Sequence, residues 1–285
     1  MFFELYWQYF VAGLLLWATV KFGFCVRNSL KQGKPSKSRP SNDTELRESD
    51  SDDATHESLS PALPKDLKHI PLNFTKLPAN ISLERSKEFY ELMNKRRTVR
   101  HFSKEFVPKE IVENIIRTAG TAPSGAHTEP WTYVVVSDLT TKQKIREIIE
   151  EQEELNYMKR MGKVWTTDLL PLKTNWIKEY LTDAPYLLLV FKQTSSVKPD
   201  GAKKLHYYSD QSVSIAAGIL LAAIHYAGLV SLTSTPLNCG PALRALLHRP
   251  ETEKLSLLLP VGYPAEGALI PDLSRKGLNE IMVEF

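Results

Sequence analysis

The sequence predicts an α+β fold, in which helices flank a mixed β-sheet, behind an N-terminal membrane-anchor helix. Three observations lead to this organisation. Residues 5–20 carry no charged side chain, residues 27–66 are rich in Ser, Pro and charged side chains, and from about residue 83 the chain alternates between helical and extended patterns. We therefore expect a membrane anchor at 1–26, a disordered tether at 27–66 and a folded domain at 67–285.

The apolar run at 5–20 is about long enough for a membrane span. Six basic residues follow it, namely Lys21, Arg27, Lys31, Lys34, Lys37 and Arg39. By the positive-inside rule they place the rest of the chain in the cytosol, with residues 5–24 in contact with lipid. Glu4 precedes the run and no Ala-x-Ala follows it, which disfavours a cleaved signal peptide. The alternative is a buried amphipathic helix.

The tether at 27–66 has few apolar residues and includes an acidic run at 45–53, so it cannot bury enough surface to offset the entropy of ordering. Three Asn-x-Ser/Thr sequons, at Asn42, Asn73 and Asn80, would instead suit a lumenal or extracellular location. Short sequons arise often by chance. We give the basic residues more weight and expect a cytosolic domain on a single-pass anchor.

The folded domain shows a series of periodic segments. We expect helices at about 86–94, 108–119, 140–160, 173–182, 204–228 and 240–248, and strands at 131–136, 185–191, 229–233 and 255–261. The segment at 213–229 looks apolar all round and is the alternative candidate for a second membrane span. Its many small residues favour a central helix in a soluble core or a dimer interface.

Composition and motifs exclude several classes of protein. The formal net charge is only +3, too near neutral to predict a nucleic-acid binder. Cys25 and Cys239 cannot build a disulfide framework, and no His or Cys pair has the spacing of metal ligands, so no metal site is expected. The sequence also lacks the common signatures of dinucleotide folds, P-loops, serine hydrolases and zinc proteases.

Two segments remain that could carry chemistry. Residues 95–100 hold four cations and a hydroxyl, which suits a phosphate or another oxyanion, although a basic run is more often a solvated face. Residues 121–131 form a loop of small and turn-forming residues between a helix and a strand. Such residues allow a ligand close to the backbone N–H groups, although a tight connection is the simpler explanation.

Together these segments resemble the nitroreductase superfamily of flavin mononucleotide (FMN) enzymes. The likeness rests on an Arg-Arg-x-x-Arg cluster, on an Ala-Pro-Ser-Gly-Ala-x-x-x-x-Pro-Trp loop about twenty residues later, on the segments at 229–236 and 259–264, and on Arg275. It spans roughly residues 83–285. The resemblance implies an interlocked homodimer with active sites at the subunit interface.

Within that superfamily the chain is most similar to the iodotyrosine deiodinases, membrane-anchored flavoproteins that remove iodide from mono- and diiodotyrosine. The resemblance implies that Arg96, Arg97, Thr98, Val99 and Arg100 hold the FMN, with Arg275 completing the phosphate clamp. It places Pro123, Ser124 and Gly125 against the flavin from the partner subunit, and it assigns Thr233, Ser234 and Thr235 to the same cofactor. Thr235 would donate to flavin N5, which favours one-electron steps.

The insertion at about 150–180 is implied to form a lid over the substrate. Glu153 would bind the substrate ammonium, Tyr157 and Lys178 its carboxylate, and the Ala126 N–H the phenolate oxygen. Glu153 and Tyr157 are four residues apart and therefore share a helix face, whereas Lys178 is expected on a later helix. NADPH, through a separate reductase, is the implied ultimate electron donor.

Two other functions fit parts of the sequence. The first is an NAD(P)H-dependent flavin nitroreductase or quinone reductase, which would lack the lid residues and ignore iodotyrosine. The second is a membrane-tethered flavin-binding or interaction module without catalysis, in which the acidic tether would be the functional segment. Bound flavin would argue against a plain scaffold, and iodide release under reduction would argue against both alternatives.

Overall fold

The computed structural model describes residues 61–198 and 201–285, which belong to one compact unit. The predicted anchor, most of the tether and the sequon at Asn42 lie outside the described residues. Among the helices that are described, none combines the length and the apolarity needed to cross a bilayer.

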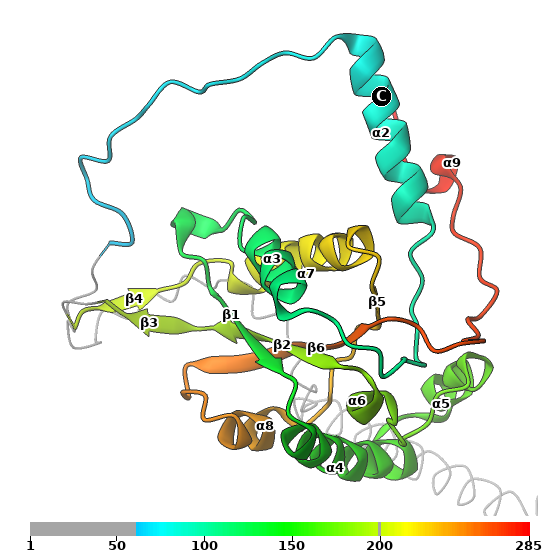
Figure 1. The fold of residues 1–285 in the computed structure, drawn as a ribbon. Coiled ribbons are helices and arrows are strands. Elements are labelled where there is room, and N and C mark those ends of the chain that lie inside the picture. The colour runs from blue at the N-terminus through cyan, green and yellow to red at the C-terminus, as the bar shows by residue number, and fades with distance from the viewer. Residues whose placement is uncertain (1–60, 199–200) are drawn as a thin grey trace, which may run out of the picture. The chain divides into compact units, whose positions relative to one another are not determined.

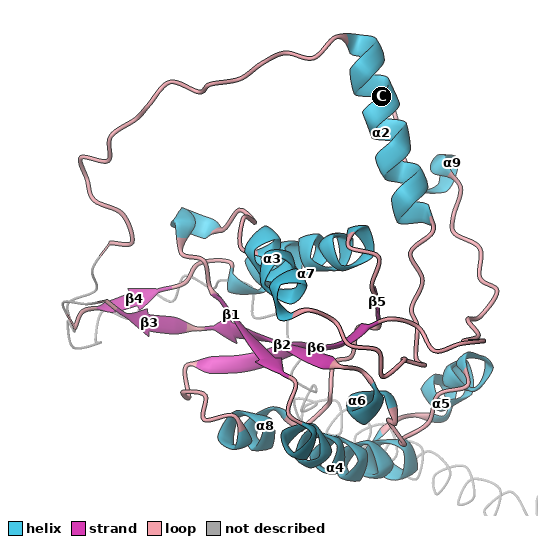
Figure 2. Ribbon diagram, in the orientation of Figure 1, coloured by secondary structure: helices cyan, strands magenta, loops and turns pink. Residues whose placement is uncertain are grey.

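A four-stranded antiparallel sheet forms the centre of the domain, in the order β1 (Trp131–Val136), β2 (Tyr186–Gln193), β6 (Glu253–Gly262) and β5 (Val230–Ser231). A parallel bridge between Thr98 and Ser231 adds a further segment beside β5, so the sheet is mixed at this edge. The prediction of an α+β fold with a mixed sheet is confirmed (Figures 1 and 2).

Helices cover both faces of this sheet (Figure 1). On one face lie α3 (Lys109–Ala119) and α7 (Ser209–Tyr226), and on the other α4 (Leu139–Leu155), α6 (Tyr180–Asp183) and α8 (Gly240–Leu246). Strand β2 serves both layers because successive side chains point to opposite faces: Leu187, Leu189 and Phe191 pack toward α4, and Leu188 and Val190 pack toward α7.

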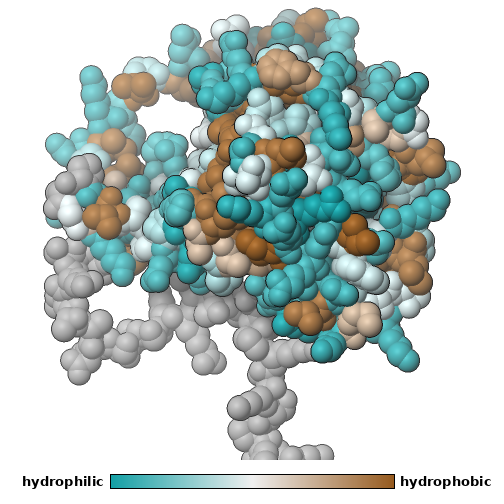
Figure 3. Space-filling view, turned by 60° about the horizontal axis from the view of Figure 1, so that its bottom comes forward, coloured by the Kyte–Doolittle hydropathy of each residue, from teal (hydrophilic) through white to brown (hydrophobic). Residues whose placement is uncertain are grey.

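The remaining elements lie around this core. They are α2 (Ala79–Asn94), the 3₁₀ turn η1 (Gly125–His127), the π-turn η2 (Asn156–Arg160), α5 (Lys163–Leu169), the 3₁₀ turn η3 (Leu170–Leu172), the hairpin β3 (Ser195–Val197) and β4 (Lys203–Leu205), and α9 (Leu278–Ile281). In the space-filling view, apolar side chains form separate groups among hydrophilic ones (Figure 3).

Two sequence predictions about these elements are wrong. The helix expected at 173–182 is a loop except for the single turn α6, because η3 already ends in Lys173 with a positive φ of 50°. The helix expected at 204–228 begins only at Ser209, because residues 203–205 pair with β3 and Tyr208 is left-handed. The hairpin β3–β4 was not expected, since its short strands have no apolar alternation.

Candidate active site

The arginine cluster lies where the chain leaves α2 and joins the edge of the sheet. Val99 is buried, and its backbone N–H donates to the Ser231 carbonyl at 3.2 Å, which fixes the segment that carries Arg96 and Arg97. This segment, β5 and the C-terminal segment line a cavity of about 200 Å³, here called the arginine cavity.

The C-terminal segment returns to the same place from 180 residues further along the chain. Arg275 donates to the carbonyl of Arg96 at 2.7 Å and to the carbonyl and side-chain oxygens of Asn94 at 2.9 and 3.0 Å, while Arg97 donates to the Pro271 carbonyl. The structure therefore brings together Arg96, Arg97 and Arg275, which the resemblance assigned to the FMN site.

The electrostatics of this cluster favour an anion. Burial lowers the pKa of the Arg96 guanidinium, and the positive charges of Arg275 and Arg97 lower it further. Within residues 61–198 and 201–285, none of these three arginines forms an ion pair with a carboxylate. A phosphate would supply the missing negative charge, so the residues present fit FMN.

A second cavity of about 170 Å³ is lined by three of the four predicted substrate residues, and we call it the lid cavity. Its walls include Glu153, Tyr157 and Lys178 from the lid (residues 150–180), and they also include Arg100, Thr233, Ser234 and Thr235. Three of the predicted substrate residues and four of the predicted flavin residues thus line the same small cavity.

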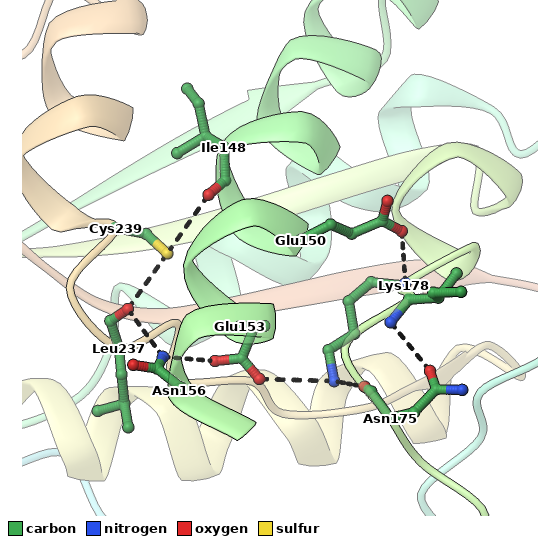
Figure 4. Close-up of polar contacts among 9 residues, drawn as sticks. Ile148, Glu150, Glu153, Asn156, Asn175, Lys178, Leu237 and Cys239 are labelled. Carbon is green, nitrogen blue, oxygen red and sulfur yellow. Dashed lines mark hydrogen bonds and ion pairs between the residues drawn. The ribbon is translucent and has the colours of Figure 1, made fainter. Parts of the chain in front are cut away.

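Glu153 and Lys178 are both nearly buried and form an ion pair with a distance of 3.6 Å between Oε2 and Nζ (Figure 4). Burial lowers the pKa of the Lys178 ammonium, and Glu153 opposes this effect. The ammonium also lies 5.5 Å from the centre of the Tyr157 ring, a cation–π geometry. Burial raises the pKa of the Tyr157 hydroxyl, so that it stays a neutral donor.

Lys178 reaches this position from a loop, not from the predicted helix. Its backbone N–H donates to Glu150 Oε1 at 2.6 Å, and its ammonium donates to the Asn175 carbonyl. Sequence reasoning missed Glu150 and Asn156, which organise the lid, because both lie in a polar run that looks like an exposed helix. A helical projection around Glu153 would have placed Asn156 on its side of α4.

The loop at 123–126 does not line either cavity in the described part of the chain. Ala126 is left-handed, with φ 48° and ψ 31°, and its N–H donates no hydrogen bond there, whereas the N–H groups of His127 and Thr128 donate to Ser124 and Gly125. A Cβ on Gly125 would lie 2.9 Å from the Tyr207 carbonyl oxygen, so glycine is required. The loop therefore presents a strained backbone with a free donor.

Comparisons with known proteins agree with this geometry. Residues 93–263 match the nitroreductase family model. The iodotyrosine deiodinase of Danio rerio is 53% identical over 277 residues, which cover 93% of this chain and 94% of the relative. Iodotyrosine deiodinase 1 of Homo sapiens is 62% identical over 219 residues, or 77% of this chain and 76% of the relative.

A solved structure is also similar. The crystal structure of an oxidized iodotyrosine deiodinase bound to FMN and 3-iodo-L-tyrosine has a TM-score of 0.60 and 34% sequence identity, covering 69% of this chain and 98% of the other. The chain therefore belongs to the nitroreductase family and, within it, to the iodotyrosine deiodinases.

Proposed function

We propose that the chain catalyses the FMN-dependent reductive removal of iodide from mono- and diiodotyrosine, which yields tyrosine and iodide for salvage. The observation that carries this proposal is the lid cavity, in which Glu153 and Lys178 offer opposite charges next to Thr233, Ser234 and Thr235. The family membership supports it, because the relative of solved structure is described as bound to FMN and 3-iodo-L-tyrosine.

Substrate recognition follows from the charges on the lid. An amino acid is a zwitterion, so Glu153 binds its ammonium, and Lys178 with the Tyr157 hydroxyl binds its carboxylate. The two side chains are nearly buried and pair with each other. The substrate takes over both partners, and the lid then excludes water from the cavity.

The FMN is held by Arg96, Arg97, Thr98, Val99, Arg100 and Arg275. FMN supplies the reducing electrons when it is bound. The Thr235 hydroxyl would donate a hydrogen bond to the flavin edge, and Arg100, which also lines the lid cavity, would bind at the pyrimidine side. Arg96, Arg97 and Arg275, which have no carboxylate partner among the described residues, would hold the phosphate end.

The substrate phenol is bound as the phenolate. Iodine ortho to a hydroxyl withdraws electrons and lowers the phenol pKa below the roughly 10 of tyrosine. The free N–H of Ala126 holds that oxygen by a charge-assisted hydrogen bond. This loop does not line the lid cavity of its own chain, which supports its placement at the cavity of a partner subunit.

The assay for this activity uses purified protein with its bound flavin. The visible spectrum reports FMN, and iodide release from diiodotyrosine is measured after reduction with dithionite. A yellow protein that releases no iodide but reduces nitroaromatics with NAD(P)H would overturn the deiodinase proposal.

The proposed assembly is an interlocked homodimer. Helix α2 buries none of its own residues, and the chain after Ala268 exposes Leu269, Leu273, Ile281 and Phe285. An apolar groove of about 710 Å³ lies between α2, α3 and α7, lined by side chains such as Phe89, Ile111 and Ile219. These exposed apolar surfaces support a partner subunit as the cover. Removal of residues 1–34 should leave a soluble dimer, and a flavin-bound monomer would contradict it.

The proposed setting is a membrane, with residues 5–24 in lipid and the catalytic domain in the cytosol. The basic residues after the span support this orientation. A separate NADPH-linked reductase supplies the electrons. Fractionation of the full chain against a variant that lacks residues 1–26 tests the anchor, and glycan analysis at Asn73 and Asn80 tests the orientation.

A further inference from the structure

Asn156 is the most deeply buried polar residue of the lid, with 1% of its surface exposed. It stands at the end of α4, as the first residue of the π-turn at Asn156–Arg160, whose i to i+5 bond joins the Met161 N–H to the Asn156 carbonyl at 2.7 Å. Turns of this type often occur at functional sites. A buried amide must satisfy its donors and acceptors, so its partners show what it does.

The Asn156 amide nitrogen faces two acceptors. Nδ2 donates to Glu153 Oε1 at 3.2 Å and to the Leu237 carbonyl at 3.4 Å (Figure 4). The amide oxygen faces two donors, Arg160 Nη1 at 3.1 Å and Asn238 Nδ2 at 3.4 Å. In the reversed orientation the amide oxygen would face the two acceptors, Glu153 Oε1 and the Leu237 carbonyl, and the amide nitrogen would face the two donors. The orientation found here therefore satisfies these groups.

The contact with Glu153 divides the two oxygens of that carboxylate between different tasks. Oε1 accepts from the neutral Asn156 amide, and Oε2 pairs with Lys178 at 3.6 Å. When Lys178 turns to a substrate carboxylate, the Asn156 bond stays in place, because neither of its partners binds the substrate carboxylate. Oε2 is then the oxygen left free for an ammonium group.

The contacts with Leu237 and Asn238 anchor this arrangement outside the lid. Both residues follow directly after the segment that carries Thr233, Ser234 and Thr235 in the lid cavity. The same segment is fixed to α4 by the buried Cys239, whose Sγ lies 3.4 Å from the Leu237 carbonyl oxygen and 4.0 Å from that of Ile148. Asn156 is thus the point at which the lid is tied to the flavin side of the cavity.

We propose that Asn156 is a positioning residue for substrate selection: its amide holds Glu153 so that Oε2 meets the substrate ammonium. This inference rests on the proposed function. It requires a hydrogen-bond donor at this position, and not merely a side chain of the right size.

Asn156→Asp tests that requirement, because it keeps the shape and replaces the donor by a carboxylate. Two carboxylates side by side raise the pKa of one of them, and a protonated carboxyl can donate as the amide did. The affinity for 3-iodotyrosine, measured by quenching of FMN fluorescence in the full-length flavoprotein, should fall at least about tenfold relative to wild type at pH 8. At pH 6 the affinity of the variant should lie within about threefold of the wild-type affinity.

The affinity of the variant is divided by the wild-type affinity at the same pH. The titration of the substrate phenol affects both proteins equally and therefore cancels. Asn156→Ala should weaken binding at both pH values without recovery, because it has no proton to regain. Asn80→Asp makes the same chemical change on the exposed first turn of α2 and should leave the affinity unchanged. Binding of 2-iodophenol, which has no ammonium, should not respond to any of these substitutions.

An unchanged affinity of Asn156→Asp across this pH range would overturn the proposal, as would an equal loss at both pH values. If the variant fails to bind FMN, Arg160→Ala decides instead, since it removes an exposed donor to the amide oxygen and should cost about two- to fivefold in affinity. Unchanged affinity of Arg160→Ala would count against the proposal.

A wild-type protein that does not bind 3-iodotyrosine would refute the proposed function itself. This result can be distinguished from a failure of the Asn156 proposal.

Discussion

Two glutamates are almost completely buried, but their surroundings differ. Glu253, at the start of β6, accepts two bonds from Arg249 at 2.7 and 2.8 Å and a third from the Thr132 hydroxyl at 2.7 Å. Glu153, in the lid, has contacts of 3.2 Å with Asn156 and 3.6 Å with Lys178. The first carboxylate is fully compensated for burial and stabilises the fold, whereas the second can still accept a ligand.

The arginines show the same contrast. Arg249 is paired with a carboxylate of the same chain, that of Glu253. The hydrogen bond from its guanidinium to Glu253 raises the Arg249 pKa. Arg96 lies beside Arg97 and Arg275, and its pKa is lowered by burial and by its neighbours. A half-buried cluster of cations without a carboxylate partner among the described residues is typical of a site for an anion.

The largest effect is expected at the loosely held pair. Glu153→Gln and Lys178→Gln should each weaken iodotyrosine binding by about 2–5 kcal/mol, because each leaves one charge of the substrate without a partner in a desolvated cavity. This corresponds to a loss of about 30-fold to several thousand-fold in affinity, which flavin-fluorescence quenching can measure.

The control ligand for these variants is 2-iodophenol, which lacks both charges and should bind equally poorly to all of them. The FMN content should not change, because neither residue belongs to the arginine cavity. Wild-type affinity for diiodotyrosine in both variants would mean that the lid pair is as structural as Arg249 and Glu253.

The next effect concerns the arginines. Arg97→Ala removes a charge-assisted contact worth about 1.5–3 kcal/mol to a phosphate and should give nearly colourless protein. Arg275→Ala should act in the same direction. Arg249→Ala is the matched control, since it removes a paired arginine and should lower stability while the protein keeps its yellow colour. Full occupancy of FMN in Arg97→Ala and Arg275→Ala would contradict the phosphate clamp.

Much of the fold could be predicted because burial leaves a periodic trace in the sequence. The strand at 131–136 has the predicted bounds. Strand β2 begins one residue later and ends two residues later than predicted, and β6 begins two residues earlier and ends one residue later. The helix predicted at 173–182 was wrong because the pattern of apolar and polar residues there suits a loop as well as a helix. What fixes that segment is the contact between the Lys178 N–H and Glu150, which lie 28 residues apart.

The site was predictable only in part, for a similar reason. The arginine cluster and the loop at 123–126 are local patterns, so a resemblance could find them. Asn156 and Glu150 act through contacts with distant segments. A helical projection puts Asn156 on the same side of the helix as Glu153, but only those contacts bury its amide. The different character of Glu153 and Glu253 likewise depends on which donors the fold brings within reach.

A smaller effect is expected at the tightly held pair. Glu253→Gln should lower the free energy of unfolding by about 1–3 kcal/mol, because one Arg249 donor then faces an amide nitrogen. Chemical denaturation measures the change. Iodotyrosine affinity and FMN content should stay as in wild type, and a loss of affinity would show that the two carboxylates are not separate in function.

The smallest effect is the pH dependence that Glu253 adds to stability. Burial alone would raise its pKa, but the hydrogen bonds from Arg249 and Thr132 outweigh burial and hold the pKa below the usual 4.5. A carboxyl whose pKa is lower in the folded than in the unfolded state stabilises the fold above the unfolded value, and this contribution is lost as the pH falls through the folded value. Between pH 7 and 5 the stability difference between wild type and Glu253→Gln should therefore be constant, and below pH 4.5 it should shrink. Urea denaturation of both proteins from pH 7 to 3 gives this difference directly. A difference that grows on acidification would mean that Glu253 carries a proton in the fold, and the contrast with Glu153 would then rest on the wrong charge state.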